Sequence, residues 1–296
     1  MLPVYTFADI AALPADSRIR LGVIGNPIAH SKSPQMQQAA LDADGNALTY
    51  VRLLAGLEEG GFEALLELLA ERGFIGVNVT VPFKKKAFAA AVRADELSTL
   101  CGAANTLVLR EDGWHCFNTD GPGFEWAIEE LCGRSLRELR VVILGACGGA
   151  GSALCCQCTL SGCRHLTLVN RPRPELESLQ ALLQPLAAGE LQALTFDSPD
   201  FHTAVESADL IVNATSLGLH AGDPLPLDAA RLHPGQLVYD IVTHATPLQD
   251  AAAERGCTVS DGLGMLLRQG AIAYQHWFGS RPDTGLMSTA LLHSQC

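Results

Sequence analysis

The sequence Arg140-Val-Val-Ile-Leu-Gly-Ala-Cys-Gly-Gly-Ala-Gly151 joins an apolar, β-branched run to a glycine-rich turn, and a stretch with helical spacing follows. This order predicts a buried strand, a tight turn and a helix whose free N–H groups can face a pyrophosphate. In the usual G-x-G spacing the second glycine would stand at position 147, where this chain has cysteine. Either the thiol is tolerated there, or Cys147 is an insertion and Gly148 takes the role of the glycine. Close packing of the helix on the strand is the alternative explanation of the glycines.

The next predicted strand ends in basic residues. Asn170-Arg171-Pro172-Arg173 stands where an NAD-preferring site commonly places an acidic side chain for the ribose 2′-hydroxyl. Guanidinium groups suit a 2′-phosphate by charge and by their forked donors, so the sequence favours NADP over NAD. A solvated basic loop is the alternative. Asn213-Ala-Thr-Ser-Leu-Gly218 closes a further strand with small polar groups, as a loop that approaches a nicotinamide would.

Predicted strands alternate with helical patterns on both sides of the glycine-rich turn. After the turn's own strand (139–146) come strands at 165–171, 208–214 and 236–242. Before it lie strands at 20–25, 48–54 and 73–80, helices at 33–43 and 58–72, and a hairpin at 105–118. Such alternation predicts an α/β fold with mainly parallel sheets. We expect an N-terminal α/β substrate domain (1–120 with 263–296) and a Rossmann-type, doubly wound NADP domain (121–262). The last long helix, at about 263–278, is expected to return to the first domain.

Composition excludes several classes of protein. The 296 residues are 48% hydrophobic and 18% charged, which is a globular balance. A net charge of −12 argues against nucleic acid as a partner, and the chain has no apolar run of about 18 residues that could span a membrane. No secretion signal is visible, so we expect a cytoplasmic protein whose ten cysteines are reduced thiols. The cluster Cys155, Cys156, Cys158 and Cys163 is interpreted as helix packing, with a metal site as the alternative.

A second group of polar residues precedes the glycine-rich turn. Gly25-Asn-Pro-Ile-Ala-His-Ser-Lys-Ser-Pro34 follows the first strand and offers two hydroxyls, Ser31 and Ser33, at a helix entrance. These hydroxyls and nearby N–H groups suit a carboxylate without any arginine. Alternatively, Ser33 only caps the helix, with Pro34 at its first position. His30 is interpreted as structural.

Lysine and aspartate offer a proton-transfer pair. Asn78-Val-Thr-Val-Pro-Phe-Lys84 ends a strand with Asn78 and Thr80 on one face. Lys85 and Lys86 fit a solvated helix start, whereas Lys84 is assigned a functional role. Asn105 and the stretch Asn118-Thr-Asp-Gly121 complete the set. If Lys84 and Asp120 meet, the carboxylate holds the ammonium and favours its charged form, and the ammonium can donate to a developing alkoxide.

Taken together, these motifs resemble the shikimate dehydrogenases. The matching stretches run in family order from about Leu21 to Trp277: Gly25–Pro34, Asn78–Lys84, Gly102–Thr106, Asn118–Gly121, Asn170-Arg171, Asn213–Gly218 and Asp261–Leu266 with Gln269. The resemblance implies a two-domain enzyme of aromatic amino-acid biosynthesis that interconverts 3-dehydroshikimate and shikimate with NADP(H). It leaves open whether the enzyme is a monomer or a homodimer.

The resemblance also implies residue roles. Lys84 and Asp120 match the catalytic pair of the family. The substrate would be surrounded by Ser31, Ser33, Asn78, Thr80, Asn105 and Gln269. The cofactor would be served by Glu96, Gly145, Ala146, Gly148, Gly149, Ala150, Asn170, Arg171, Arg173, Thr215, Ser216, Ile241 and Gly262.

One departure from the family pattern bears on specificity. Thr243 stands where the family has a tyrosine that contacts substrate, and two residues are missing before Thr246. Serine rather than threonine at position 33 favours shikimate over quinate. Alternatives to a shikimate dehydrogenase are a related enzyme for quinate or an amino analogue, and a non-catalytic NADP-binding regulator of the same fold.

Overall fold

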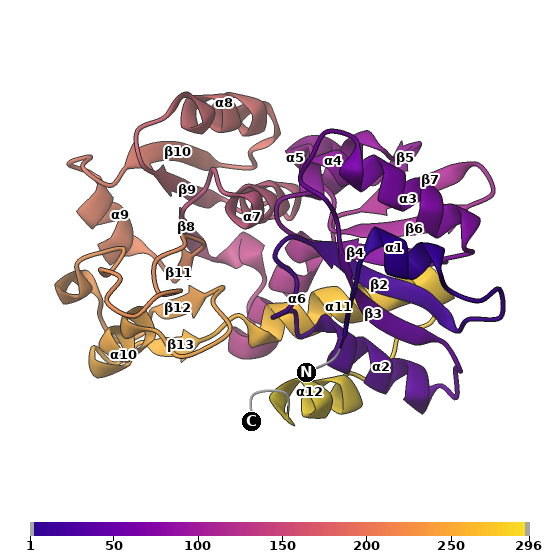
Figure 1. Ribbon diagram of the computed structural model, residues 1–296. Coiled ribbons are helices and arrows are strands. Elements are labelled where there is room, and N and C mark those ends of the chain that lie inside the picture. Colours follow the sequence, from indigo (N-terminus) through magenta and orange to yellow (C-terminus); the bar gives the residue numbers. More distant parts are fainter. Residues whose placement is uncertain (1–2, 294–296) are drawn as a thin grey trace. The chain divides into compact units, whose positions relative to one another are not determined.

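The computed structural model describes residues 3–293 of the chain (Figure 1). These residues form two compact units. The first contains the described residues up to Thr119 and from Leu267 onward, and the second is Asp120–Leu266. The chain therefore enters the second unit once and leaves it once, inside helix α11 (Leu263–Phe278).

The first unit is built on a mixed sheet with the strand order β1-β3-β2-β4-β6-β7-β5 among the described residues. Strands β1 to β4 pair in parallel, whereas β6 runs antiparallel to both β4 and β7. The strands are β1 (Val4–Tyr5), β2 (Ile19–Gly25), β3 (Thr49–Leu54), β4 (Gly76–Val79), β5 (Arg93–Ala94), β6 (Thr106–Arg110) and β7 (Gly113–Phe117). The helices are α1 (Phe7–Ala11), α2 (Ser33–Ala43), α3 (Gly61–Glu71), α4 (Lys84–Ala89), α5 (Glu96–Cys101), most of α11, and α12 (Thr284–His293).

Helix α11 is tied to the first unit by hydrogen bonds from its interior. Gln37 of α2 donates to the carbonyl of Gly270 at 2.9 Å, and the Trp277 indole donates to the carbonyl of Leu107 at 3.1 Å. A Cβ on Gly270 would lie 2.2 Å from Met36 Cε, so the glycine allows α2 and α11 to approach closely. The expected return of this helix to the first part of the chain is confirmed.

The second unit contains a parallel sheet with the strand order β10-β9-β8-β11-β12-β13 among the described residues. Its strands are β8 (Arg140–Leu144), β9 (His165–Asn170), β10 (Glu190–Thr195), β11 (Leu210–Asn213), β12 (Leu237–Asp240) and β13 (Thr258–Ser260). Its helices are α6 (Asp120–Cys132), α7 (Gly149–Leu160), α8 (Pro174–Leu183), α9 (Phe201–Ser207) and α10 (Pro247–Glu254), with 3₁₀ turns at Leu136–Glu138, Gln184–Leu186 and Ala229–Arg231. Strand order reverses on the two sides of β8, so ligands are expected at the carboxyl end of this strand.

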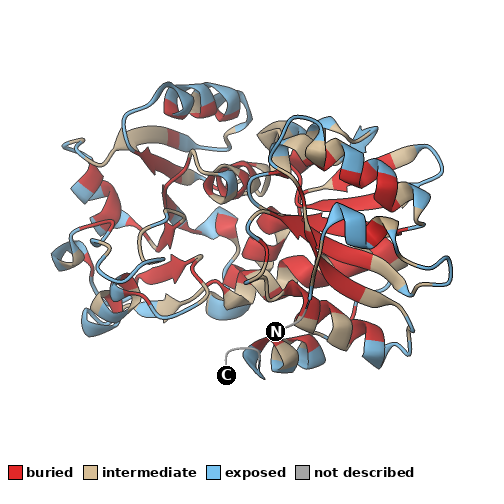
Figure 2. Cartoon of the chain, in the orientation of Figure 1, coloured by how far each residue is buried: buried red, intermediate tan, exposed pale blue. Residues whose placement is uncertain are grey.

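The buried residues of each unit are concentrated in its sheet. The central strands of each unit are buried, whereas the outer faces of the helices and the connecting loops are exposed (Figure 2). The doubly wound α/β fold predicted from the alternation of strands and helices is confirmed. The short or peripheral elements that were not predicted include β1, β5, β10, β13, α1, α5 and α12. Within residues 3–293, no helix combines the length and apolar character that a membrane span requires.

The cysteine cluster lies in the interior of the second unit. Cys155, Cys156 and Cys158 on α7 are fully buried, and the cysteines among the described residues are free thiols. The Cys163 thiol donates to the carbonyl of His165 at 3.4 Å. Burial raises the pKa of Cys163 to about 11. Residues 3–293 contain no group of three side chains placed to hold a metal ion.

Two glycines of the turn differ in the space around them. A Cβ on Gly151 would lie 2.2 Å from the carbonyl oxygen of Gly145, whereas a Cβ on Gly149 would meet nothing within 4 Å. We expect Gly151→Ala to lower the free energy of unfolding by about 1–3 kcal/mol through overpacking. Gly149→Ala, the matched control, should leave it unchanged or raise it by up to about 1 kcal/mol. Denaturant unfolding of the two variants tests this expectation, and equal stabilities would contradict it.

Candidate active site

The glycine-rich turn lies at the carboxyl end of β8. Gly145 has φ of +84°, and a Cβ there would lie 2.7 Å from the carbonyl oxygen of Ala214. Its N–H donates to the carbonyl of Val169 at 2.8 Å, and Gly148 in turn donates to the carbonyl of Gly145 at 2.9 Å. Helix α7 starts directly after Gly148, so its first N–H groups are available to a bound anion.

A pocket of about 680 Å³ opens beside this turn, entirely within the second unit. Seven residues predicted for the cofactor line it: Gly145, Gly148, Asn170, Arg171, Arg173, Thr215 and Ser216. The rest of its lining is largely apolar: Phe196, Ala214, Leu217, Leu219, Leu225 and Pro226. A lining that combines glycines and arginines with apolar side chains suits a nucleotide, which has a charged and an apolar part.

The other predicted cofactor residues lie outside this lining. Ala146 is buried beneath the turn, and Gly149 and Ala150 form the first turn of α7. Gly262 packs against Ile241, whose carbonyl oxygen would lie 2.1 Å from a Cβ on the glycine. Glu96 belongs to the first unit, where it begins α5. Because Gly148 rather than Cys147 lines the pocket, the structure favours the interpretation that Gly148 takes the role of the second glycine.

Asn170, the last residue of β9, and the two arginines that follow it differ in their surroundings. The Asn170 side chain is buried, accepts from the N–H of Cys147 at 3.4 Å and donates to the carbonyl of Arg171 at 3.1 Å. Arg173 forms two bonds of 2.9 Å with the carboxylate of Glu175, which raises the pKa of its guanidinium. Arg171 is exposed at the pocket wall. Of the two arginines, Arg171 is therefore the better placed to bind the 2′-phosphate that distinguishes NADP from NAD.

A buried carboxylate holds the loop that follows β11. Asp240 is fully buried and accepts from the Asn213 amide at 3.1 Å and from the Thr246 hydroxyl at 2.8 Å. Asn213 in turn accepts from the N–H and the hydroxyl of Thr215, at 3.1 and 2.6 Å. Burial raises the pKa of Asp240, against the opposing effect of its hydrogen bonds. This network fixes Thr215 at the pocket wall.

Removal of the Asp240 charge should disturb this loop. Asp240→Asn replaces one acceptor oxygen by a donor that faces the donors of Asn213 or Thr246, at a cost of about 1–3 kcal/mol. We expect the KM for the nucleotide to rise about tenfold, since about 1.4 kcal/mol corresponds to a factor of ten. Asp250→Asn on the exposed side of α10 is the control and should behave like the wild type. Unchanged nucleotide binding in Asp240→Asn would contradict the proposed role of the network.

The first unit contains a buried polar network that includes three predicted substrate residues. Asn105 accepts from the N–H of Thr119 at 2.7 Å and donates to the Gln269 amide oxygen at 3.3 Å. Asn78 donates to the Thr106 hydroxyl at 3.1 Å. Asn78, Asn105 and Gln269 are each at least 92% buried. The structure thus brings β4, β6 and α11 together through amide side chains, which can present both donors and acceptors to a polyhydroxylated ligand.

The two predicted serines lie at the start of α2, next to this network's sheet. Ser33 is buried and its N–H donates to the Ser31 hydroxyl at 3.3 Å. The capping position of α2 is Lys32, without a side-chain cap, and Ser33 is already the first helical residue. The alternative that Ser33 caps the helix is therefore wrong. Thr80 packs on the same loop, since a Cβ on Gly25 would lie 2.6 Å from Thr80 Cγ2.

The three consecutive lysines have different environments. Lys85 is exposed, and Lys86 pairs with Glu63 of α3 at 3.4 Å. Lys84 is half-buried, and its carbonyl accepts from the N–H of Ala104, next to Asn105. Asp120 is 7% exposed and directly follows Thr119, which Asn105 holds. Lys84 thus differs from Lys85 in its burial and from Lys86, which is also half-buried, in that Lys86 pairs with Glu63.

Two groups of site residues were not predicted. The apolar pocket wall begins at Phe196, directly after strand β10, and this strand has only a weak local pattern. Tyr50 donates to the Asn78 amide oxygen at 2.7 Å. Its signal in the sequence is that of an ordinary core residue of a strand, because a tyrosine hydroxyl reveals its partner only in the folded chain.

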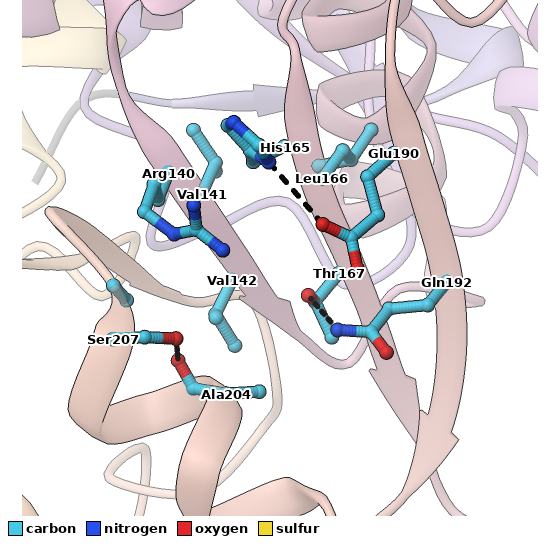
Figure 3. Close-up of a pocket in the computed structure, with 11 residues that line it drawn as sticks. Arg140, Val141, Val142, His165, Leu166, Thr167, Glu190, Gln192, Ala204 and Ser207 are labelled. Atoms are coloured by element: carbon cyan, nitrogen blue, oxygen red, sulfur yellow. Dashed lines mark hydrogen bonds and ion pairs between the residues drawn. The ribbon is translucent and has the colours of Figure 1, made fainter.

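A second cavity lies at the opposite end of the second unit's sheet. The first residues of three adjacent strands, Arg140, His165 and Glu190, line it, and His165 pairs with Glu190 at 3.3 Å (Figure 3). Its volume of about 20 Å³ accommodates roughly one water molecule. Since doubly wound sheets bind ligands at the carboxyl ends of their strands, this cavity is no candidate for the active site.

The fold and the pocket define the class of the protein: a two-unit α/β protein with a Rossmann-type dinucleotide site. Comparison with known proteins narrows the class. Residues 23–107 match the family model of the shikimate dehydrogenase substrate binding domain, and residues 262–292 match that of the shikimate 5'-dehydrogenase C-terminal domain. A shikimate dehydrogenase (NADP(+)) of Paracoccus denitrificans is 37% identical over 265 residues, which are 88% of this chain and 91% of that protein. The chain belongs to the shikimate dehydrogenase family.

Solved structures agree with this assignment. The shikimate 5-dehydrogenase of Thermus thermophilus, in complex with NADP(H) and shikimate, is 32% identical with a TM-score of 0.80, and the match covers 93% of this chain and 99% of that one. A quinate dehydrogenase from Corynebacterium glutamicum, in complex with NAD, is 28% identical with a TM-score of 0.83 and the same coverage. The fold is thus shared by enzymes with two different substrates.

Proposed function

We propose that this protein is an NADP-dependent oxidoreductase that interconverts 3-dehydroshikimate and shikimate in aromatic amino-acid biosynthesis. The observation that carries the proposal is the pocket in which the glycine-rich turn meets Arg171, in a chain of the shikimate dehydrogenase family. In this proposal the second unit binds NADP and the first unit binds the substrate.

The residues at the pocket fit NADP. A side chain at position 145 would collide with Ala214, so the turn requires glycine there. Because glycine has no side chain, the backbone of the turn stays accessible to a pyrophosphate. The α7 N–H groups can hold the pyrophosphate, Arg171 the 2′-phosphate, and Thr215 and Ser216 the nicotinamide end. When bound, NADPH supplies the hydride that leaves from C4 of its nicotinamide ring.

In the first unit, each substrate group has a proposed partner. The Ser31 and Ser33 hydroxyls donate to the carboxylate, since a serine hydroxyl can donate to an anion. Asn78, Thr80, Asn105 and Gln269 bind the ring hydroxyls, and the hydrogen bonds of the three amide side chains fix their orientation before the substrate arrives. Such preorganisation reduces the entropy lost when the substrate is bound.

Lys84 moves the proton, and Asp120 positions Lys84. During reduction, the Lys84 ammonium donates a proton to the ketone oxygen as the carbonyl carbon becomes an alcohol carbon. During oxidation, the neutral amine takes the proton of the substrate hydroxyl. In this proposal Asp120 orients the Lys84 amine and a neighbouring substrate hydroxyl for the transfer.

A kinetic comparison of shikimate and quinate, each with NADP and with NAD, tests the proposal. We expect the highest kcat/KM for shikimate with NADP. Quinate is the second candidate substrate, because Thr243 stands where the family has tyrosine and because the quinate dehydrogenase shares the fold. A higher kcat/KM for quinate would replace the substrate assignment. Tight NADP binding without turnover of either compound would indicate a regulator instead of an enzyme.

We further propose that the enzyme works in the cytoplasm as a monomer or homodimer, with neither nucleic acid nor membrane as a partner. The free thiols among the described residues support a reducing compartment, and the net charge of −12 disfavours polyanions.

A further inference from the structure

Strand β3 carries a buried cation next to the serine loop. Arg52 is only 3% exposed and lies in the middle of β3, where it is in register with Val4 on one side and Val23 on the other. Burial lowers the pKa of its guanidinium. Because removing a charge from water is costly, an arginine in this position indicates that the fold uses the charge or its forked donors.

The forked donors of Arg52 are directed at the serine loop. Its Nε and Nη2 both donate to the carbonyl oxygen of Ser31, at 3.1 and 2.5 Å, and Nη2 also reaches the Gln35 amide oxygen at 3.5 Å. The N–H of Ser31 donates to the carbonyl of Ile28 at 3.1 Å. Both ends of the Ser31 backbone are therefore held, and the Ser31 hydroxyl in turn accepts from the N–H of Ser33.

Tyr50, on the same face of β3, also donates to a proposed substrate residue. Side chains at positions 50 and 52 share one face of a strand. Tyr50 donates to the Asn78 amide oxygen at 2.7 Å, just as Arg52 donates to the Ser31 carbonyl. Side chains on one face of β3 thus contact two proposed substrate residues. Asn78 is assigned to the ring hydroxyls and Ser31 to the carboxylate.

We propose that Arg52 is a positioning residue for recognition of the substrate carboxylate. It fixes the serine loop so that the Ser31 and Ser33 hydroxyls converge on the carboxylate, and its charge provides a local positive potential in a chain of net charge −12. This inference rests on the proposed function and adds to it a charged group that acts through Ser31. A neutral donor would hold the carbonyl but would provide no such potential.

The experiment compares shikimate with its methyl ester, which has the same ring and hydroxyls but carries a methyl group in place of the negative charge. In Arg52→Gln we expect kcat/KM for shikimate to fall about 10–100-fold, mainly through KM, whereas kcat/KM for the ester falls by less than about threefold. The KM for NADP should stay at the wild-type value and thereby report an intact second unit. Arg52→Lys keeps the charge but loses the fork, so the loss for shikimate should be intermediate.

Tyr50→Phe is the matched control on the same strand face. It removes the bond to Asn78 and should lower kcat/KM for shikimate and for the ester by the same factor, because Asn78 is assigned to the ring hydroxyls. Equal losses for the two substrates in Arg52→Gln would mean that Arg52 only supports the fold, and they would overturn the inference. If Arg52→Gln does not fold, the same comparison in Arg52→Met decides, because this variant also removes the charge and equal losses there also overturn the inference.

The failure of the inference can be distinguished from the failure of the proposed function. A wild-type enzyme that oxidises shikimate with NADP, together with equal losses in the variants, overturns only the role of Arg52. A wild-type chain that binds NADP but oxidises no shikimate overturns the proposed function and this inference with it.

Discussion

Replacement of Lys84 by methionine is expected to lower kcat for shikimate oxidation by about 10²–10⁴-fold, the usual contribution of a general acid–base group. The KM for shikimate should change little, because the ring hydroxyls and the carboxylate are bound by other residues. An interaction used only in the transition state lowers kcat and kcat/KM together. Lys84 is half-buried, and its backbone carbonyl accepts from the N–H of Ala104, next to Asn105 of the amide network. Steady-state kinetics of the purified variant measures the effect.

Lys85→Met is the matched control for this prediction. Lys85 is exposed one residue further along α4, so the substitution removes the same charge without reaching the site. We expect its kcat within about twofold of the wild type, as for an exposed charge of small energetic effect. A near-normal kcat in Lys84→Met would rule out the Lys84–Asp120 pair as the route of the proton.

Replacement of Arg171 by alanine should raise the KM for NADP about 10–100-fold and leave the KM for NAD nearly unchanged. A hydrogen bond to a charged group contributes about 1.5–3 kcal/mol, which corresponds to roughly one to two powers of ten in affinity. NAD has no 2′-phosphate and therefore loses nothing when the guanidinium is removed. The ratio of kcat/KM for the two nucleotides is the quantity to measure.

Arg173→Ala is the comparison for the second arginine. Its guanidinium already binds the carboxylate of Glu175 through two bonds of 2.9 Å, so a phosphate must compete with that pair. We expect a rise in the KM for NADP of less than about fivefold, consistent with the small net contribution of an exposed ion pair. Equal losses for NADP and NAD in Arg171→Ala would contradict recognition of the 2′-phosphate by this residue.

Elements with a strong local pattern were predicted closely. Helices α2 and α11 have the predicted bounds, since both combine apolar periodicity with clear sequence signals at their starts. Strands β10 and β13 lie at the two edges of the second sheet and are only partly buried, so their sequences lack a continuous apolar run. The short strands β1 and β5 have two residues each, too few to show any period.

The candidate site also contains residues that the sequence predicted and residues that it did not. The glycine-rich turn, Asn170, Arg171 and Thr215 lie at or just after strand ends. The parallel sheet brings such ends to one edge, where these residues line one pocket. The apolar wall of that pocket was missed, because Phe196 follows a strand that was itself missed. The assignment of Ser33 as a cap was a local alternative that the backbone of α2 excludes.

The sequence by itself determined the strand–turn–helix at Gly145, the two series of strands and the types of side chain available to the site. These are local properties, fixed by φ/ψ preferences, by spacing and by the chemistry of single residues. Only the tertiary structure decided which of these residues hold one another. Arg52 reaches Ser31 across 21 residues, and Asn105 reaches Gln269 across 164. Such hydrogen bonds form only after packing has brought distant segments together and excluded water from them, and no local pattern records which partner a polar side chain will meet.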